Sequence, residues 1–144
     1  MHNDFYASGF LFHYPTQQIL LQKTITAQDQ QSQWTLFVGK KEKEEKSSDT
    51  FHRVIVEQLK LNLPNASIFS VYDYIHEKTG HLHFVHYGQI DKLREFVIPG
   101  ALFSWFTFKQ ITKLPMSQLT RQDITVGQRV INLVIRNASD TVYT

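Results

Sequence analysis

Residues 39–61 decide how the rest of this sequence is interpreted: GKKEKEEKSSDTFHRVIVEQLKL. Residues 40–46 hold four lysines and three glutamates, a composition typical of a solvated loop. From Ser48 onward the apolar residues recur every three or four positions, which is the spacing of one helix face. The members of this predicted apolar stripe are Phe51, Val54, Ile55, Leu59 and Leu63. The stretch therefore predicts a charged loop followed by a helix with one buried face.

The sequence also marks the two ends of this helix. Ser47, Ser48 and Asp49 offer side-chain oxygens that can cap a helix N-terminus, and Pro64 is expected to end the helix. Arg53 and Glu57 lie one helical turn apart, so they share a face. We predict that this face is the polar side of the helix.

Outside this stretch the sequence alternates between β-rich runs and a second helix. Strands are predicted over residues 6–13, 19–22, 34–38, 68–76, 81–90 and 101–108, and residues 26–33 are expected to form a loop. Residues 77–80 are typical of a hairpin turn. The last helix is expected to open with the capping-box spacing of Thr120 and Asp123 and to reach about Arg136. Strands interleaved with helices indicate an α/β protein with a mixed sheet covered by helices.

Length and composition restrict the class of protein. The 144 residues, 42% of them hydrophobic and 19% charged, are expected to form one domain over residues 1–144 and exclude intrinsic disorder. The absence of cysteine excludes a disulfide framework and thiolate chemistry. A net charge of +2 gives no argument for nucleic-acid binding, and no apolar run approaches the ~20 residues of a membrane span. Because the start has no signal-peptide pattern, we expect a cytoplasmic protein.

Residues 39–61 resemble the signature of the Nudix (MutT-like) hydrolase superfamily. That signature reads glycine, five residues, glutamate, seven residues, then arginine-glutamate-aliphatic-any-glutamate-glutamate-any-glycine-aliphatic. The matching positions are Gly39, Glu45, Arg53, Ile55, Glu57 and Leu61. Val54 and Gln58 stand where the signature has glutamates, and Lys60 stands where it has glycine. The resemblance implies the Nudix fold, a mixed β-sheet sandwiched between α-helices.

The family context extends beyond the signature. Trp34 and Leu36, which precede Gly39, resemble the family's usual tryptophan-x-leucine-proline-glycine-glycine approach to the signature. Trp105, followed by Leu114-Pro115, resembles the late tryptophan strand and the short helix after it.

In the family, the three glutamates of the signature helix hold magnesium, which neutralises a pyrophosphate and activates a water. Those positions are Val54, Glu57 and Gln58, so one carboxylate remains, and glutamine offers a neutral carbonyl oxygen. Residues 98–104, where some members have a further acidic ligand, contain no acid, although Glu95 lies upstream. The resemblance therefore implies lost or much reduced catalysis and weak or absent magnesium binding. Glu57 is the vestigial catalytic candidate, and Glu57 and Gln58 are the metal candidates.

The resemblance gives structural roles to Gly39, Glu45 and Arg53. In the family the arginine pairs with the loop glutamate and holds the loop against the helix, in a bidentate geometry that lysine cannot supply. We expect this pair between Arg53 and Glu45. The alternative is that Glu45 is a solvated charge like the other charges of residues 40–46.

Two further groups of residues are candidates for binding. His76, His81 and His83 fall on one side of the predicted hairpin and His86 on the other, so three imidazoles are available to a zinc or nickel ion. Exposed hairpin tips also carry histidines with no chemical role. Aromatic residues near the signature either stack on a base or belong to the core: Trp34, Phe103, Trp105 and Phe106.

Three functions remain open from the sequence. The first is a Nudix-fold protein with lost or much reduced pyrophosphohydrolase activity that binds a nucleotide or a nucleoside-diphosphate derivative. The second is an active Nudix hydrolase with an atypical metal shell, which uses Glu57, Glu45 and a carboxylate that the sequence does not identify. The third is a non-catalytic protein-interaction module. Neither a membrane nor a specific nucleic acid is expected as a partner, and the protein is expected to be a monomer or homodimer.

Overall fold

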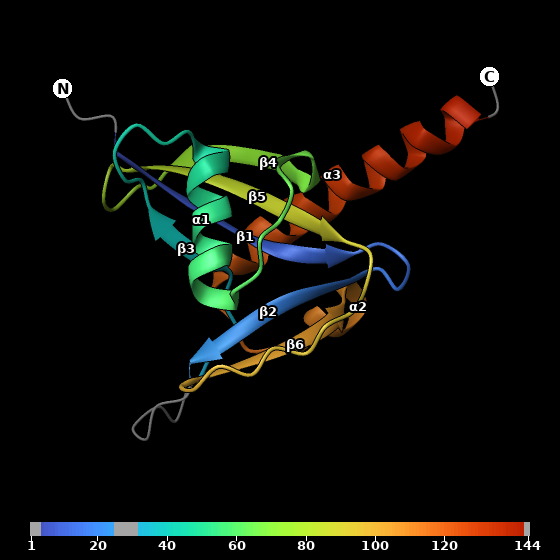
Figure 1. The fold of residues 1–144 in the computed structure, drawn as a ribbon, viewed down its shortest axis with the longest axis horizontal. Helices are drawn as coiled ribbons and strands as arrows, with labels where there is room; N and C mark the ends of the chain where they lie inside the picture. The colour runs from blue at the N-terminus through green and yellow to red at the C-terminus, as the bar shows by residue number, and fades with distance from the viewer. Residues whose placement is uncertain (1–3, 25–31, 143–144) are drawn as a thin grey trace.

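The structure, a computed structural model, describes residues 4–24 and 32–142 and places six strands and three α-helices among them (Figure 1). The strands are β1 (Phe5–His13), β2 (Gln18–Thr24), β3 (Phe37–Lys40), β4 (Ile68–Ile75), β5 (Leu82–Ile90) and β6 (Ala101–Thr107). The helices are α1 (Ser47–Leu59), α2 (Phe108–Ile111) and α3 (Gln118–Val142), with a short 3₁₀ turn at Asn65–Ser67. The loop expected at residues 26–33 lies mostly outside the described residues.

Strand β1 organises the sheet because it has neighbours along both edges. One edge pairs in parallel with β5 from Phe5 to His13. The other edge is shared by two antiparallel strands: β3 pairs with Tyr6–Gly9 and β2 with Leu11–His13. Strand β2 then pairs with β6, so the sheet order is β4-β5-β1-β2-β6, with β3 beside β1. Gly39, the first residue of the signature, therefore lies on β3, near the point where the partner of β1 changes from β3 to β2.

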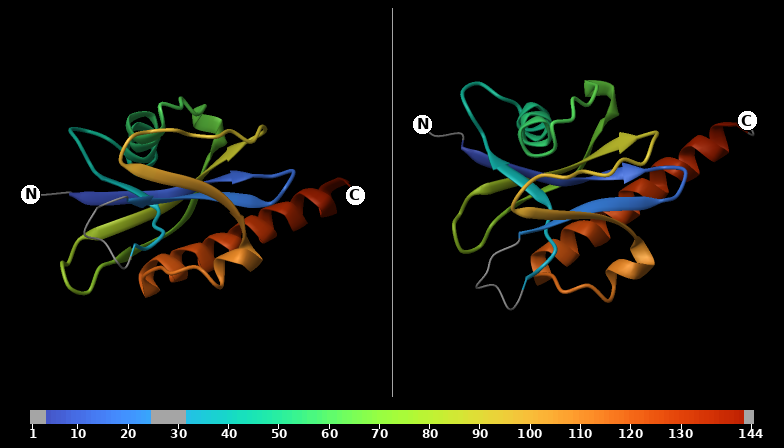
Figure 2. Two further views of the ribbon diagram at one scale, coloured as in Figure 1. Left: turned by 90° about the horizontal axis from the view of Figure 1, so that it is seen from below. Right: turned by 60° about the horizontal axis from the view of Figure 1, so that its bottom comes forward.

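The two faces of the sheet are covered by different helices, with α1 on one side and α3 on the other (Figure 2). Alternation along β1 divides the core accordingly, because successive side chains point to opposite faces. Phe10 and Phe12 pack in the cluster that includes Ile131 of α3, whereas Leu11 packs with Phe51 of α1. This is the predicted α/β arrangement of a mixed sheet between helices.

Helix α1 buries the predicted apolar stripe as far as Leu59, and Leu63 is buried in the chain beyond the helix. Phe51, Val54, Ile55, Leu59 and Leu63 are all buried, whereas Glu57 is exposed and Arg53 half-buried. The predicted ends of the helix are wrong. Lys46 is the N-cap, and its backbone N–H donates to the Asp49 carboxylate at 3.0 Å.

The helix ends before Pro64 is reached, because Lys60 adopts a left-handed conformation at φ 57° and ψ 34°. This conformation closes a helix C-terminus and is normally taken by glycine. It is also the position at which the Nudix signature has glycine. The backbone geometry of the signature is thus kept by a residue for which it is strained.

Other predicted boundaries are also corrected by the structure, and among them α3 runs to Val142 rather than ending at about Arg136. Strand β3 starts at Phe37 rather than at Trp34, since Thr35 makes only an isolated bridge to Gln22. Helix α3 starts at Gln118, because the Ser117 hydroxyl oxygen already accepts from the Thr120 N–H at 3.1 Å. The capping box predicted at Thr120 and Asp123 is therefore wrong, and Asp123 is instead buried inside the fold.

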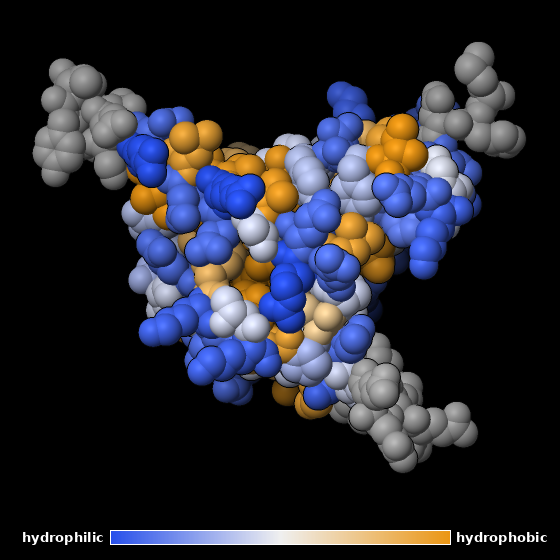
Figure 3. Space-filling view, turned by 180° about the vertical axis from the view of Figure 1, so that it is seen from behind, coloured by the Kyte–Doolittle hydropathy of each residue, from blue (hydrophilic) through white to orange (hydrophobic). Residues whose placement is uncertain are grey.

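The surface on the α3 side mixes hydrophilic and hydrophobic side chains without one continuous apolar face (Figure 3). Leu133 and Val134 are the large apolar residues of α3 that are exposed among the described side chains. Within the described ranges, no helix is long and apolar enough to span a bilayer.

Candidate functional site

The Arg53 guanidinium lies at the centre of the signature region. Its Nε and Nη2 donate to the two carboxylate oxygens of Glu45 at 2.8 and 3.1 Å, a bidentate pair. Nη2 also donates to the backbone carbonyl of Lys40 at 2.6 Å, and Nη1 to the Glu57 carboxylate at 3.2 Å. Glu42 approaches Nε at 3.1 Å. The name Arg53 cluster is used below for Glu42, Glu45, Arg53, Glu57 and the Lys40 carbonyl.

Contacts within the Arg53 cluster favour the ionised forms of Glu45 and Arg53. Hydrogen bonding to Arg53 lowers the pKa of Glu45 to about 2, and the same contact raises the pKa of Arg53 above its ordinary value. Glu45 also accepts from the Thr50 hydroxyl at 3.0 Å and from the Glu42 N–H at 2.8 Å. The contact expected between Arg53 and Glu45 is therefore present, and Glu45 is not a merely solvated charge.

Val54 turns away from solvent and fills space against β3. Its side chain is 1% exposed, and a methyl group added at Gly39 would clash with a Val54 methyl carbon. A side chain at position 39 would therefore have to displace the helix from the strand. The position that carries a site-facing glutamate in the signature is here part of the hydrophobic core.

Gln58 is fixed by hydrogen bonds to β3 and β2. Its Nε2 donates to the Val38 carbonyl at 3.1 Å, and its Oε1 accepts from Gln22 Nε2 at 3.4 Å. Gln22 in turn donates to the Leu36 carbonyl at 3.1 Å. The amide group of Gln58 thus directs its nitrogen, which has no lone pair for a cation, at the backbone oxygen next to Gly39.

Glu57 is the carboxylate left on this helix face. Its side chain is 56% exposed, and one carboxylate oxygen is paired with Arg53. Among the described residues no group of three His, Cys, Asp or Glu side chains is placed to hold a metal ion, and Glu95, which is exposed, does not complete one. Magnesium requires several oxygen ligands in octahedral geometry. The residues present do not fit a resident magnesium ion.

Comparison with known proteins decides the fold. The chain superposes on the NUDIX domain of Shewanella oneidensis NrtR complexed with ADP ribose, with a TM-score of 0.68 at 14% identity, over 88% of this chain and 87% of that one. An ADP compounds hydrolase gives a TM-score of 0.72 at 6% identity, over 91% and 74%. The C-terminal domain of mouse MUTYH, in complex with human PCNA, gives 0.66 at 13% identity, over 90% of both chains. The chain has the Nudix fold.

These likenesses rest on structure alone. No family model matches the sequence of this chain, and no curated protein matches it either. At 6–14% identity, the Nudix-fold structures named above establish the arrangement of strands and helices and leave the chemistry to be argued from the residues of this chain.

The aromatic residues considered for base stacking are half-buried and pack against the core of this Nudix fold. Trp34 meets Phe106 edge to face, with ring centroids 4.9 Å apart, and Phe103 stacks on Phe37 at 6.1 Å. Trp105 packs against the α1 cluster, and its indole N–H donates to the Arg94 carbonyl at 2.8 Å. The four rings considered for stacking thus pack within the fold.

The histidines of the hairpin lie as the alternation predicts. The His76 N–H donates to the His81 carbonyl at 2.8 Å, and His83 lies opposite Tyr74, so His76, His81 and His83 share one face. His86 lies on the other face, where it is hydrogen-bonded to Ser47 at 3.0 Å. On the shared face the rings form a stacked row with Tyr6 and Tyr74. Burial and the neighbouring imidazoles lower the pKa of His83.

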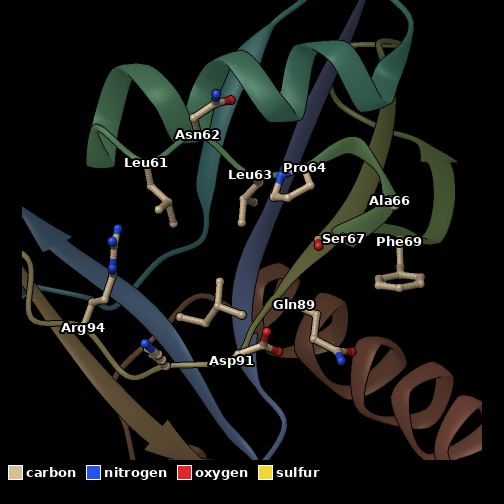
Figure 4. A pocket seen from close by; sticks show the side chains of 12 residues that line it. Leu61, Asn62, Leu63, Pro64, Ala66, Ser67, Phe69, Gln89, Asp91 and Arg94 are labelled. Carbon is tan, nitrogen blue, oxygen red and sulfur yellow. The ribbon is translucent and has the colours of Figure 1, made fainter.

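A pocket that the sequence did not indicate adjoins the signature at its last residue, Leu61. It has a volume of about 410 Å³ and lies between the chain leaving α1 and the end of β5 (Figure 4). The name loop pocket is used for this cavity, which is lined by residues 61–64, 66, 67, 69, 89–92 and 94. Its two walls are about 30 residues apart in the chain, so no local pattern could reveal it.

Proposed function

We propose that this chain is a member of the Nudix superfamily that binds a nucleotide or a nucleoside-diphosphate derivative and has lost most or all pyrophosphohydrolase activity. The observation that carries the proposal is the hydrogen bonding of Gln58. Its amide nitrogen donates to the Val38 carbonyl, at the place where the signature supplies a carboxylate for a metal. With Val54 buried, Glu57 is the single acidic group among the three signature-helix positions.

Catalysis is expected to be reduced because the signature helix offers too little negative charge to hold magnesium. Magnesium sheds its hydration shell reluctantly and needs anionic oxygen ligands to be held. Glu57 is exposed and already paired with Arg53, so it offers a weak site. Replacing even a group that orients a metal ligand commonly lowers metal affinity or activity about 10- to 100-fold. Losing two of three carboxylates should have a larger effect.

The ligand class is supported by the structural likenesses. One of the superposed Nudix domains is complexed with ADP ribose, and another structure is of an ADP compounds hydrolase. A nucleotide derivative that binds this chain without metal should raise its melting temperature equally in magnesium and in chelator. At a ligand concentration 100 times Kd the gain in unfolding free energy would be about 2.7 kcal/mol.

The test is a hydrolysis assay with nucleoside triphosphates, dinucleotide polyphosphates and sugar nucleotides in excess magnesium. We expect turnover no higher than in chelator, together with a thermal shift by at least one nucleotide derivative. Robust turnover that is lost both in chelator and in the Glu57→Gln variant would refute the proposal. That outcome would establish an active hydrolase with an atypical metal shell.

A second candidate function is a protein-interaction module. The observation that favours it is the likeness to the C-terminal domain of mouse MUTYH, which was crystallised in complex with human PCNA. The two candidates differ in the thermal-shift experiment, since an interaction module has no reason to be stabilised by nucleotide derivatives. Absence of any shift across the nucleotide panel would favour the interaction module.

A further inference from the structure

The backbone of residues 91–94, which forms the rim of the loop pocket, is fixed by hydrogen bonds from two side chains. His13 is buried, and its Nε2 donates to the backbone carbonyl of Asp91 at 3.0 Å, while its Nδ1 lies 2.7 Å from the Thr16 hydroxyl. Trp105 donates to the carbonyl of Arg94 at 2.8 Å. The backbone at both ends of residues 91–94 is thus fixed by buried or half-buried rings. A preformed pocket of this kind avoids the entropic cost of ordering its walls around a ligand.

The polar groups of the loop pocket are available to a ligand. Arg94 stands at one end with its guanidinium directed toward Leu61, and the Ser67 hydroxyl and Asp91 carboxylate face the hollow (Figure 4). Within the described part of the chain, neither Arg94 nor Lys92 forms an ion pair. The walls between these groups are apolar and include Leu63 and Ile90. The loop pocket therefore combines two cations, hydrogen-bonding groups for hydroxyls, and apolar sides.

This set of groups selects a particular ligand chemistry. Arginine binds phosphate through paired N–H groups, and a second cation suits the charge of a phosphomonoester. A carboxylate and a hydroxyl are suited to the hydroxyls of a sugar, and Asp91 and Ser67 supply them among the lining residues.

We propose that the loop pocket binds the sugar-phosphate end of a nucleotide derivative. Its phosphate pairs with Arg94 and Lys92, and its sugar hydroxyls bond to Asp91. The identity of the ligand as part of a nucleotide rests on the function proposed above. A volume of about 410 Å³ lies within the range of small-molecule sites. The ligand then lies beside Leu61, the last position of the signature, without needing a metal.

The experiment measures binding of ribose 5-phosphate, adenosine monophosphate and adenosine by calorimetry in chelator. We expect the two phosphates to bind and adenosine to bind at least about 10-fold more weakly, since it lacks the charged contact. Arg94→Ala keeps the backbone carbonyl that Trp105 uses and should lower phosphate affinity about 10-fold or more. Arg129→Ala is the matched control, because Arg129 is an exposed arginine on α3 and should leave affinity unchanged.

A second variant tests the loop pocket by filling its space, without removing a charge. Ala66→Trp places a ring at the wall of the loop pocket and should abolish binding while the far-ultraviolet circular dichroism stays unchanged. Amide chemical shifts on adding ribose 5-phosphate should move in residues 61–69 and 89–94. Wild-type affinity in both the Arg94→Ala and Ala66→Trp variants, or shifts confined to other residues, would overturn the proposal.

The same measurements separate this inference from the proposed function. Nucleotide derivatives that bind the wild type and both pocket variants alike would refute the pocket and leave the function standing. Binding of ribose 5-phosphate in the loop pocket, with no binding of any nucleoside-diphosphate derivative, would support the pocket and refute the function.

Discussion

Replacing Gln58 with glutamate should destabilise the protein in the absence of magnesium and make its stability respond to magnesium. Glutamate can still accept from Gln22, but it loses the N–H that donates to the Val38 carbonyl at 3.1 Å. An anionic oxygen would then face a carbonyl oxygen. The lost hydrogen bond is worth about 0.5–1.5 kcal/mol, and with the added repulsion we expect a loss of about 1–2 kcal/mol of unfolding free energy.

Magnesium should reverse this loss. In the variant, the new carboxylate lies beside Glu57 on α1 and near the Val38 carbonyl, so that three oxygen ligands become available. Magnesium at 10 times its Kd would return about 1.4 kcal/mol. Urea denaturation in magnesium and in chelator measures both effects, and Gln58→Ala is the control that loses the hydrogen bonds to Val38 and from Gln22 without gaining charge. The reasoning fails if magnesium stabilises the wild type as much as the glutamate variant, or if that variant is as stable as wild type in chelator.

Three further predictions concern the residues that shape the fold around the site. Arg53→Ala should speed hydrogen exchange in residues 40–46 and lower the unfolding free energy by about 1–3 kcal/mol. Arg53→Lys should recover only part of this stability, because lysine cannot form the bidentate pair. Unchanged hydrogen exchange in Arg53→Ala would contradict the role of the Arg53 cluster. Lys60→Gly should raise stability by about 0.5–1 kcal/mol by relieving the left-handed backbone, whereas Lys60→Ala should not, as thermal unfolding would show. Asp123, 4% exposed, has a pKa raised to about 6 by burial, so the stability it contributes at acidic pH is lost as pH rises from about 4 through 6. Asp123→Asn can keep the bond from Tyr72 and should flatten that part of the stability profile; an unchanged slope would refute the assignment.

The periodicity of the sequence predicted the parts of the fold that depend on burial. The stripe from Phe51 to Leu59 is buried because a helix must turn every third or fourth residue toward the sheet. The strands were predicted because alternation and turn residues are local signals, and the β4–β5 hairpin closes at Gly80 as expected. The pairing of Arg53 with Glu45 followed from the resemblance to the Nudix signature rather than from periodicity.

The features that the sequence did not predict depend on contacts between distant residues or on backbone strain. The bonding of Gln58 requires Gln22, which lies on β2, and the loop pocket requires β5 and the end of α1 to meet. A helix usually ends at a glycine, and Lys60 stands at that position of α1. The sequence therefore carries no sign of an end before Pro64. Ser117 rather than Thr120 caps α3, because several neighbouring residues offer similar oxygens and only packing selects among them.

Two of the three departures from the signature, Val54 and Gln58, favour folding without a metal. Three glutamates on one helix face repel one another unless a cation neutralises them. Val54 replaces one of these charges with apolar surface packed on Gly39, and Gln58 replaces another with a hydrogen bond to β3. The bidentate pair of Arg53 and Glu45 meanwhile holds the preceding loop against α1 through protein atoms alone. The loop and helix can thus keep the Nudix geometry with no cation, which is the condition that the proposed metal-free binding of a nucleotide derivative requires.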